Sequence, residues 1–252
     1  EELRKEVLEL YFAVRMFINI HDRLDENYMI YSEFDEAGRF KVRLFCVNPA
    51  KCLQEFLDKG NSAVFFSATL LPIRYYKLLL STSKEDYAIY AKSPFDPANR
   101  RILLGMDVST KYTRRGSEMY RRYAEYLIQA AKARQGNYLA FFPSYRFMEE
   151  VYEEFILMLE EREAAGETGS IEYIMQSQYM TEEAREIFLE NFEESREQSL
   201  VGFCVMGGIF SEGIDLAEDK LIGALIVGTG LPQVCREREL LKMYFDAQGL
   251  RG

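Results

Sequence analysis

The feature of this sequence that most constrains its fold is a regular alternation of short apolar runs with longer amphipathic stretches. Four apolar runs from residue 137 onward have the length of buried strands: "NYLAFF", "IEYIMQ", "LVGFCVM" and "LIGALIVG". Stretches with helical spacing of apolar residues lie at 116–135, 144–163 and 181–194. Strands that alternate with amphipathic helices indicate a parallel sheet covered on both faces. The sequence therefore predicts an α/β domain.

The N-terminal part is less regular. Residues 3–25 have helix-like spacing, and "YMIYSEF" and "RFKVRLFCV" around "DEAG" predict a β-hairpin, because Asp and Gly are turn residues. Further helices are predicted for "PAKCLQEFLDKG", "PIRYYKLLL" and 234–247, and buried strands for "SAVFFSA" (62–68) and "RILLGMDV" (101–108). The polar segment "STSKED" (81–86) is the best candidate for a linker.

Composition excludes several classes of protein. With 252 residues, 48% of them hydrophobic, the chain can bury a core, but no apolar stretch is long enough to cross a membrane. The four cysteines have no C-x-x-C spacing, which favours reduced thiols and a cytoplasmic location and argues against a metal site. His21 is the single histidine, and we expect a lone side chain rather than a catalytic one. The start without Met suggests a piece of a longer protein.

The net charge of −10 is unevenly distributed. Residues 149–163 contain seven Glu and one Arg, and residues 182–197 contain seven Glu and two Arg, so these two helical windows account for the whole deficit. In contrast, "KYTRRGSEMYRR" (111–122) contains five Lys or Arg and one Glu. Local sign matters more than the total for a groove that holds phosphates, so this basic window is a candidate contact with nucleic acid.

Small, polar or acidic residues follow five of the predicted strands. The segments are "SATL" (67–70), "PSY" (143–145), Gln176, "GGIFSEGIDL" (207–216) and "GTGLPQ" (228–233). In open parallel sheets, ligands bind beyond the carboxyl ends of the strands. Turns alone do not need hydroxyls and carboxylates at nearly every strand end, so we expect a ligand site at this edge.

Two nucleotide-binding motifs are absent. "GTGLPQ" fails as a dinucleotide fingerprint, because Gln233 stands at the third glycine position and only 19 residues follow it. No Gly-Lys dipeptide occurs, so the chain lacks the phosphate-binding P-loop. We therefore do not expect this chain alone to cleave a nucleoside triphosphate as P-loop enzymes do.

The segments "SATL", "FFPSY" and "GGIFSEGIDL", in this order and each at a strand end, resemble motifs III, IV and V of superfamily 2 helicases of the DinG/XPD branch. The stretches "FSATLLP", "SPF" (93–95), "FFPSY", "GGIFSEGIDL" and "LIGALIVGTGLPQ" all look like DinG-type helicases, and the resemblance covers roughly residues 40–240. It implies a RecA-like fold in which residues 1–82 hold the end of the first RecA-like domain, with an N-terminal helix and hairpin. Residues 83–252 would form the second RecA-like domain, truncated before motif VI.

The resemblance also implies ligands and partners. ATP with Mg²⁺ would be shared with RecA-like domain 1 of the same protein, and an iron–sulfur cluster would lie only upstream. Single-stranded DNA is the expected partner, no membrane is expected, and no catalytic or metal-binding residue is expected within this chain. The resemblance assigns ATP binding to Glu212, Gly213 and Asp215. The alternative is that Glu212 or Asp215 caps a helix.

Eight residues are implied to contact nucleic acid. Three alternatives to these contacts stay open. Ser144 could cap a helix, Tyr145 could be a packed core residue, and the cations at 111, 114 and 115 could be the solvated start of a helix. Gly207 and Gly208 are expected to allow a sharp exit from the strand. The residues assigned to nucleic acid are Ser67, Thr69, Lys111, Arg114, Arg115, Ser144, Tyr145 and Ser211.

The function that follows is that of the C-terminal motor region of an ATP-dependent DNA helicase, inactive by itself. It would couple ATP hydrolysis to translocation on single-stranded DNA and duplex unwinding, in DNA repair or replication. A degenerate RecA-like domain that acts as a nucleic-acid-binding or regulatory module is the alternative. A doubly wound domain that binds a small metabolite explains none of the ordered motifs.

Overall fold

The computed structural model describes residues 2–35, 37–67, 69–167, 169–193, 196–230 and 234–249. The chain divides into two compact units. The described parts of 100–232 form the sheet unit, and the described parts of 1–99 and 233–252 form the hairpin unit.

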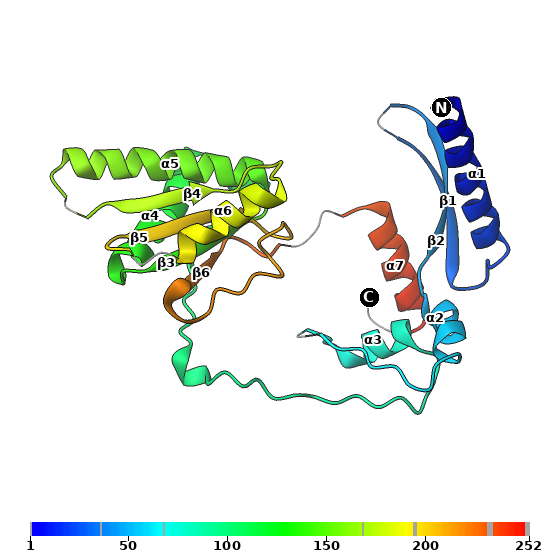
Figure 1. The fold of residues 1–252 in the computed structure, drawn as a ribbon. Helices are drawn as coiled ribbons and strands as arrows, with labels where there is room; N and C mark the ends of the chain where they lie inside the picture. The colour runs from blue at the N-terminus through cyan, green and yellow to red at the C-terminus, as the bar shows by residue number, and fades with distance from the viewer. Residues whose placement is uncertain are drawn as a thin grey trace. The chain divides into compact units, whose positions relative to one another are not determined.

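The sheet unit contains a four-stranded sheet and three long helices (Figure 1). Its strands have the order β4-β5-β3-β6, and all three neighbouring pairs are parallel. The predicted parallel α/β fold is confirmed for this unit. The elements are α4 (Ser117–Ala133), β3 (Asn137–Phe142), α5 (Tyr145–Ala164), β4 (Ile171–Met175), α6 (Glu182–Glu193), β5 (Ser199–Val205) and β6 (Gly223–Ile226), with short 3-10 helices η2 (Tyr112–Arg114) and η3 (Glu218–Lys220).

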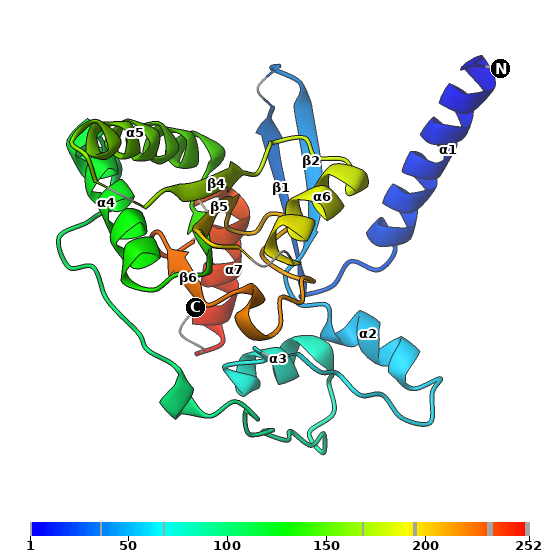
Figure 2. The same cartoon turned by 60° about the vertical axis from the view of Figure 1, so that its left-hand side comes forward.

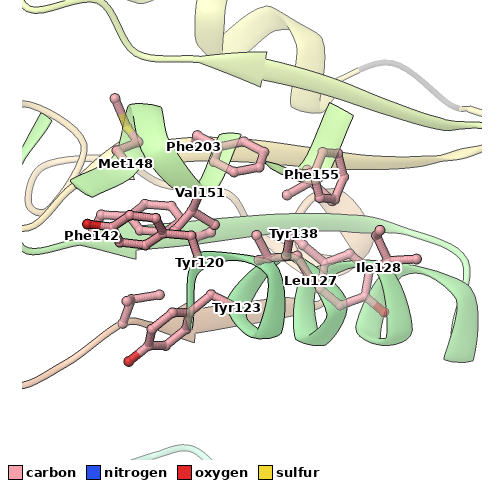
Figure 3. Packing of buried hydrophobic residues seen from close by; sticks show 14 of the residues in the cluster. Tyr120, Tyr123, Leu127, Ile128, Tyr138, Phe142, Met148, Val151, Phe155 and Phe203 are labelled. Carbon is pink, nitrogen blue, oxygen red and sulfur yellow. The ribbon is translucent and has the colours of Figure 1, made fainter. Parts of the chain in front are cut away.

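Helices cover both faces of this sheet (Figure 1; Figure 2). Side chains on β3 and β5 alternate between the faces, as the pleat of a strand requires. Phe142 and Phe203 face α4 and α5, and their rings stack with centroids 5.6 Å apart. Figure 3 shows both rings among side chains of this larger cluster, such as Val151 and Phe155. On the opposite face, a smaller cluster packs against α6.

Gly202 lies in the middle of β5 on the face covered by α6. A Cβ atom at this position would lie 2.8 Å from both the Leu139 Cδ2 atom and the Phe192 ring. Both distances are shorter than van der Waals contact, so only glycine fits without movement of its neighbours. The missing side chain thus lets the phenylalanines of α6 lie against the strand backbone.

The hairpin unit contains an antiparallel hairpin and four helices. Two tyrosine hydroxyls attach its C-terminal helix to the hairpin region: Tyr31 donates to Glu237 at 2.8 Å, and Tyr244 donates to Asn27 at 2.8 Å. The predicted helix, hairpin and turn are confirmed within the described residues, although Glu36 of "DEAG" lies outside them. The elements are α1 (Glu2–His21), β1 (Tyr28–Phe34), β2 (Phe40–Cys46), α2 (Ala50–Leu57), α3 (Ile73–Leu80) and α7 (Arg236–Ala247), with a short 3-10 helix η1 (Pro97–Asn99).

Two predicted strands are wrong. The described residues of 62–68 and all of 101–108 form no strand, and their large apolar side chains are exposed except for that of Val108, which packs partly buried against the larger core cluster. Val64 is 81% exposed, Phe66 is 89% exposed and Leu103 is 84% exposed. A strand needs neighbours that satisfy its backbone groups, and neither sheet of the described chain includes these segments. An apolar run alone cannot supply these neighbouring strands.

The cysteines behave as expected for reduced thiols. All four are free, and burial raises the pKa of the Cys204 thiol to about 12. Among the described residues, no group of three or more His, Cys, Asp or Glu side chains is placed to hold a metal ion. No helix in the described part of the chain is long and apolar enough to span a membrane.

Replacement of Gly202 by alanine tests how tightly α6 packs on the sheet. We expect Gly202→Ala to lower the free energy of unfolding by roughly 1–3 kcal/mol, because the added methyl overpacks the core. Gly60→Ala is the control, since its Cβ would make only ordinary contacts, the nearest at 3.6 Å. Urea denaturation measures both; equal stability of the two variants would contradict the packing argument.

Candidate functional site

The carboxyl ends of the four parallel strands lie along one edge of the sheet unit. Backbone hydrogen bonds continue one residue past the strands here: Met206 N donates to Phe142 O at 2.8 Å, and Gln176 N donates to Phe203 O at 2.9 Å. Val227 N donates to Phe141 O at 2.8 Å. The loops that carry the predicted site residues therefore begin side by side, as the sequence predicts for this edge.

Ser144 is the N-cap of α5. Its φ of −163° and ψ of 159° are extended, and its hydroxyl oxygen accepts a hydrogen bond from Phe147 N at 3.3 Å. The capping alternative is therefore confirmed for Ser144. A contact with phosphate stays a prediction.

Tyr145 starts α5 and is half-buried, with its ring against the larger core cluster. Its hydroxyl oxygen accepts a hydrogen bond from Gln176 Nε2 at 2.9 Å. The packed-tyrosine alternative is present in the structure. Base stacking by the same ring stays a prediction.

The two glycines after β5 have different roles. Gly207 has a φ of 71°, the left-handed region that favours glycine. A Cβ on Gly208 would lie 3.0 Å from Val205 O and 3.1 Å from Gln176 Nε2. Glycine is therefore needed at one position for backbone conformation and at the next for close approach. The expected sharp exit from the strand is observed.

The turn that follows closes on the end of its own strand. Both Gly208 N, at 3.1 Å, and the Ser211 hydroxyl, at 3.2 Å, donate to Val205 O. Ser211 N donates to Gly208 O at 3.0 Å. We call residues 206–211 the strand-exit turn. It holds the start of the acidic segment at the edge of the sheet.

Glu212 and Asp215 lie beyond this turn and are exposed. Within the described ranges, neither carboxylate has a hydrogen-bond or ion-pair partner. The helix-cap alternative for these residues is wrong, because the next helix is η3, and its N-cap is Ala217 without a side-chain hydrogen bond. Two exposed acids without partners are thus available to an external ligand.

Gly213 lies between these acids with a φ of 73°, and no atom lies within 4 Å of a Cβ built there. Backbone conformation therefore explains this glycine in the structure, and close approach to a nucleotide stays a prediction. Its carbonyl accepts a hydrogen bond from Arg185 Nη2 at 3.3 Å. Arg185, on α6, also pairs with Glu182 at 2.8 Å. Sequence reasoning missed this arginine, because nothing in an acidic helix marks one cation as a loop contact.

The basic window reaches the same edge through Arg115. Its Nε donates to Thr110 O at 3.1 Å, and its guanidinium carbon lies 5.2 Å from the Phe147 ring centroid and 5.6 Å from the Tyr112 ring centroid. This geometry is typical of a cation–π contact. Thr110 also lies against the loop after β6, since a Cβ on Gly228 would lie 2.8 Å from the Thr110 methyl group.

The cations of the window fall into two groups. Arg121 pairs with Glu161, and Arg122 pairs with Glu118 at 2.7 Å. In the described part of the chain, Lys111, Arg114 and Arg115 have no acidic partner, and all three are exposed. The unpaired cations are the three that the resemblance assigned to nucleic acid.

A pocket of about 360 Å³ opens between the loop after β4 and the strand-exit turn. Tyr145, Gln176 and Gly208 contribute to its wall, and the remaining wall comes mainly from the loop that leads to α6. Its lining contains no acidic residue, although the chain carries a net charge of −10. The lining residues are Tyr145, Gln176, Ser177, Gln178, Tyr179, Met180, Thr181, Gly208 and Ile209.

Ser67 and Thr69 belong to the hairpin unit rather than to this edge. They form a local turn in which Thr69 N donates to Ser67 Oγ at 3.3 Å, and both are exposed. Ala68 between them and residues 231–233 of "GTGLPQ" lie outside the described residues. The structure thus assembles the other predicted site residues within the sheet unit alone.

Alanine at the two glycines separates their roles. We expect Gly207→Ala to cost roughly 1 kcal/mol of stability through left-handed strain alone. Gly208→Ala should displace the strand-exit turn, because its methyl meets the Val205 carbonyl and the Gln176 amide. Chemical-shift changes in a ¹⁵N spectrum should reach Gln176 in the Gly208 variant but stay local in the Gly207 variant. The same spread in both variants would contradict this division.

Comparison with known proteins finds similarity to helicases. A family model described as the helicase C-terminal domain matches residues 127–252, which is half of the chain. A "Probable ATP-dependent helicase" of Methanocaldococcus jannaschii is 26% identical over 237 residues, covering 90% of this chain and 33% of that protein. The helicase subunit XPD of the general transcription and DNA repair factor IIH from Arabidopsis thaliana is 26% identical over 204 residues, covering 76% and 25%.

An ATP-dependent DNA helicase XPD from Sulfolobus acidocaldarius is 27% identical over 117 residues, which cover 44% of this chain and 21% of that protein. A solved XPD helicase structure aligns with 58% of this chain and 23% of its own, at 24% identity and a TM-score of 0.41. The chain spans about a third or less of the curated relatives that it matches. The chain belongs to the helicase C-terminal domain family and is a C-terminal region of the DinG/XPD-like type.

Proposed function

We propose that this chain is the C-terminal motor region of a longer ATP-dependent DNA helicase. It couples ATP hydrolysis to movement along single-stranded DNA and to duplex unwinding, in DNA repair or replication in the cytoplasm. The observation that carries the proposal is the edge of the parallel sheet. There, exposed acids without partners and exposed cations without acidic partners occur on loops of one unit, within the described residues of a chain of the helicase C-terminal domain family.

The acidic segment is the proposed ATP side of the site. Glu212, Gly213 and Asp215 would bind the nucleotide, through its ribose or its bound water. Their fit is supported by the exposure of both carboxylates and by the absence of protein partners among the described residues. ATP with Mg²⁺ supplies the phosphoryl group that is transferred to water, and this chain contributes orientation and charge.

The proposed DNA side comprises the basic window and the hydroxyls beside it. Lys111, Arg114 and Arg115 would neutralise phosphates, since no acid of the described chain already does so for them. Ser144, Tyr145 and Ser211 would add hydrogen bonds or stacking to the same strand.

The rest of the motor would come from RecA-like domain 1 of the same protein. In this proposal residues 1–82 contribute to the end of that domain, with Ser67 and Thr69 linking hydrolysis to movement of the second domain, and residues 83–252 form the second domain. The exposed apolar runs at 62–67 and 101–104 support the proposal, because such runs need covering strands that the described chain lacks. Any iron–sulfur cluster would lie in that upstream region.

Replacement of Asp215 tests the ATP side. In the full-length protein, we expect Asp215→Ala to reduce DNA-stimulated ATPase activity by roughly ten- to a hundredfold, the effect of losing one charged hydrogen bond. Asp219→Ala, which removes an exposed acid from η3, should retain activity. A full-length protein without ATPase activity, with or without DNA, would point instead to the degenerate binding module.

Replacement of Arg114 and Arg115 tests the DNA side. The double alanine variant should bind single-stranded DNA more weakly whatever its sequence. The plot of log affinity against log salt should become shallower by about 0.7 for each phosphate that the variant no longer neutralises. Arg121→Ala is the control, because Arg121 already pairs with Glu161. An unchanged salt slope in the double variant would contradict the assignment.

A further inference from the structure

Gln176 is a buried polar residue at the carboxyl edge of the sheet. It directly follows β4, and its side chain is among the least exposed of the chain, with the whole residue 2% exposed. Burial of an amide is costly unless its polar atoms are hydrogen-bonded. Its position in the core therefore depends on the partners that it finds there.

These partners determine the orientation of the amide. Val205 N lies 3.0 Å from Gln176 Oε1, and a backbone N–H can only donate, so the oxygen must face it. Gln176 Nε2 then faces the Tyr145 hydroxyl oxygen at 2.9 Å. Because an amide nitrogen can only donate, the tyrosine oxygen is the acceptor in this bond.

This orientation leaves the hydrogen of the Tyr145 hydroxyl for another partner. Among the described residues, no second polar atom bonds to this hydroxyl. Tyr145 lines the pocket of about 360 Å³, whose lining contains no acidic residue. The guanidinium of Arg115 lies over the ring of Phe147, two residues further along α5. An oxygen acceptor with negative charge suits these surroundings better than a cation.

The same amide also limits the space that is available at the start of the strand-exit turn. Gly208 approaches so closely that a Cβ there would lie 3.1 Å from Gln176 Nε2. Val205, whose N–H binds the amide oxygen, carries the carbonyl that accepts from Gly208 N and Ser211 Oγ. One buried side chain thus contacts both the first residue of α5 and the start of the turn that leads to Glu212.

We propose that Gln176 is a positioning residue. It makes the Tyr145 hydroxyl an oriented hydrogen-bond donor to a backbone oxygen of single-stranded DNA and holds the strand-exit turn in register with it. The inference rests on the proposed function and adds to it, since hydrogen bonding, rather than stacking alone, is the role that Gln176 prepares for Tyr145.

Three variants of the full-length protein test this role: Tyr145→Phe, Gln176→Glu and the double variant. An ionised carboxylate still accepts from Val205 N–H but cannot donate to Tyr145, so it takes up the hydroxyl hydrogen. Each single variant should bind a fluorescent single-stranded oligodeoxynucleotide about five- to tenfold more weakly, the effect of one hydrogen bond. The double variant should be no weaker than the singles, because both remove the same donor.

A pH series distinguishes positioning from a general structural defect. A protonated carboxyl can donate to Tyr145 as the amide does, so the deficit of Gln176→Glu relative to wild type should grow as the pH is raised. The deficit of Tyr145→Phe should stay constant. Tyr138→Phe is the matched control, since its hydroxyl donates to Arg134 O at 2.6 Å near the amino end of the same sheet. It should bind DNA as the wild type does.

The outcomes are separable. Additive losses in the double variant, or a pH-independent deficit in Gln176→Glu, would overturn the inference and leave the proposed function intact. If Gln176→Glu does not fold, Tyr145→Phe decides alone, and unchanged binding in that variant overturns the inference. A wild-type protein that does not bind single-stranded DNA overturns the inference and the proposed DNA partner together.

Discussion

The site depends on the parallel pairing of β5 with a strand on each side. All seven residues of β5 are buried, and its ladders with β3 and β4 bring three carboxyl ends to one edge, with the end of β3 opposite Val205 and the end of β4 opposite Phe203. Because both faces are covered, a slip of one residue would move phenylalanines such as Phe203 to the wrong face. Register is therefore set by the core, and the polar loops inherit their alignment from it.

Much of the sheet unit was predictable from sequence. Its strands, such as 137–142 and 199–205, are short and mostly apolar, and the helices between them carry a clear apolar stripe. The strand pattern and the helix pattern can therefore be told apart in the sequence. The segments 62–68 and 101–108 look the same in sequence but form no strand within the described chain. An apolar composition indicates that a segment can be buried. Strand pairing also depends on neighbouring strands, which lie far along the chain or belong to another domain.

The candidate site was predictable in its residue types but not in its contacts. Polar residues at strand ends indicated the correct edge, and Ser144 was open to capping from its position alone. The amide of Gln176 and the Arg185 contact with Gly213 depend on tertiary approach, for which spacing holds no signal. Similarity to known helicases assigns the chain to its family, while the ligand of each side chain remains a proposal.

Gly202 connects the interior of the sheet with its edge. Its missing side chain lets Phe188 and Phe192 lie against β5, and Arg185 projects from the same helix, one turn before Phe188, to the carbonyl of Gly213. The packing of α6 on the sheet is therefore linked, through one hydrogen bond, to the loop that carries Glu212 and Asp215. A methyl group added at Gly202 would push α6 away from the sheet. Through Arg185 it would then move the acidic loop without touching it.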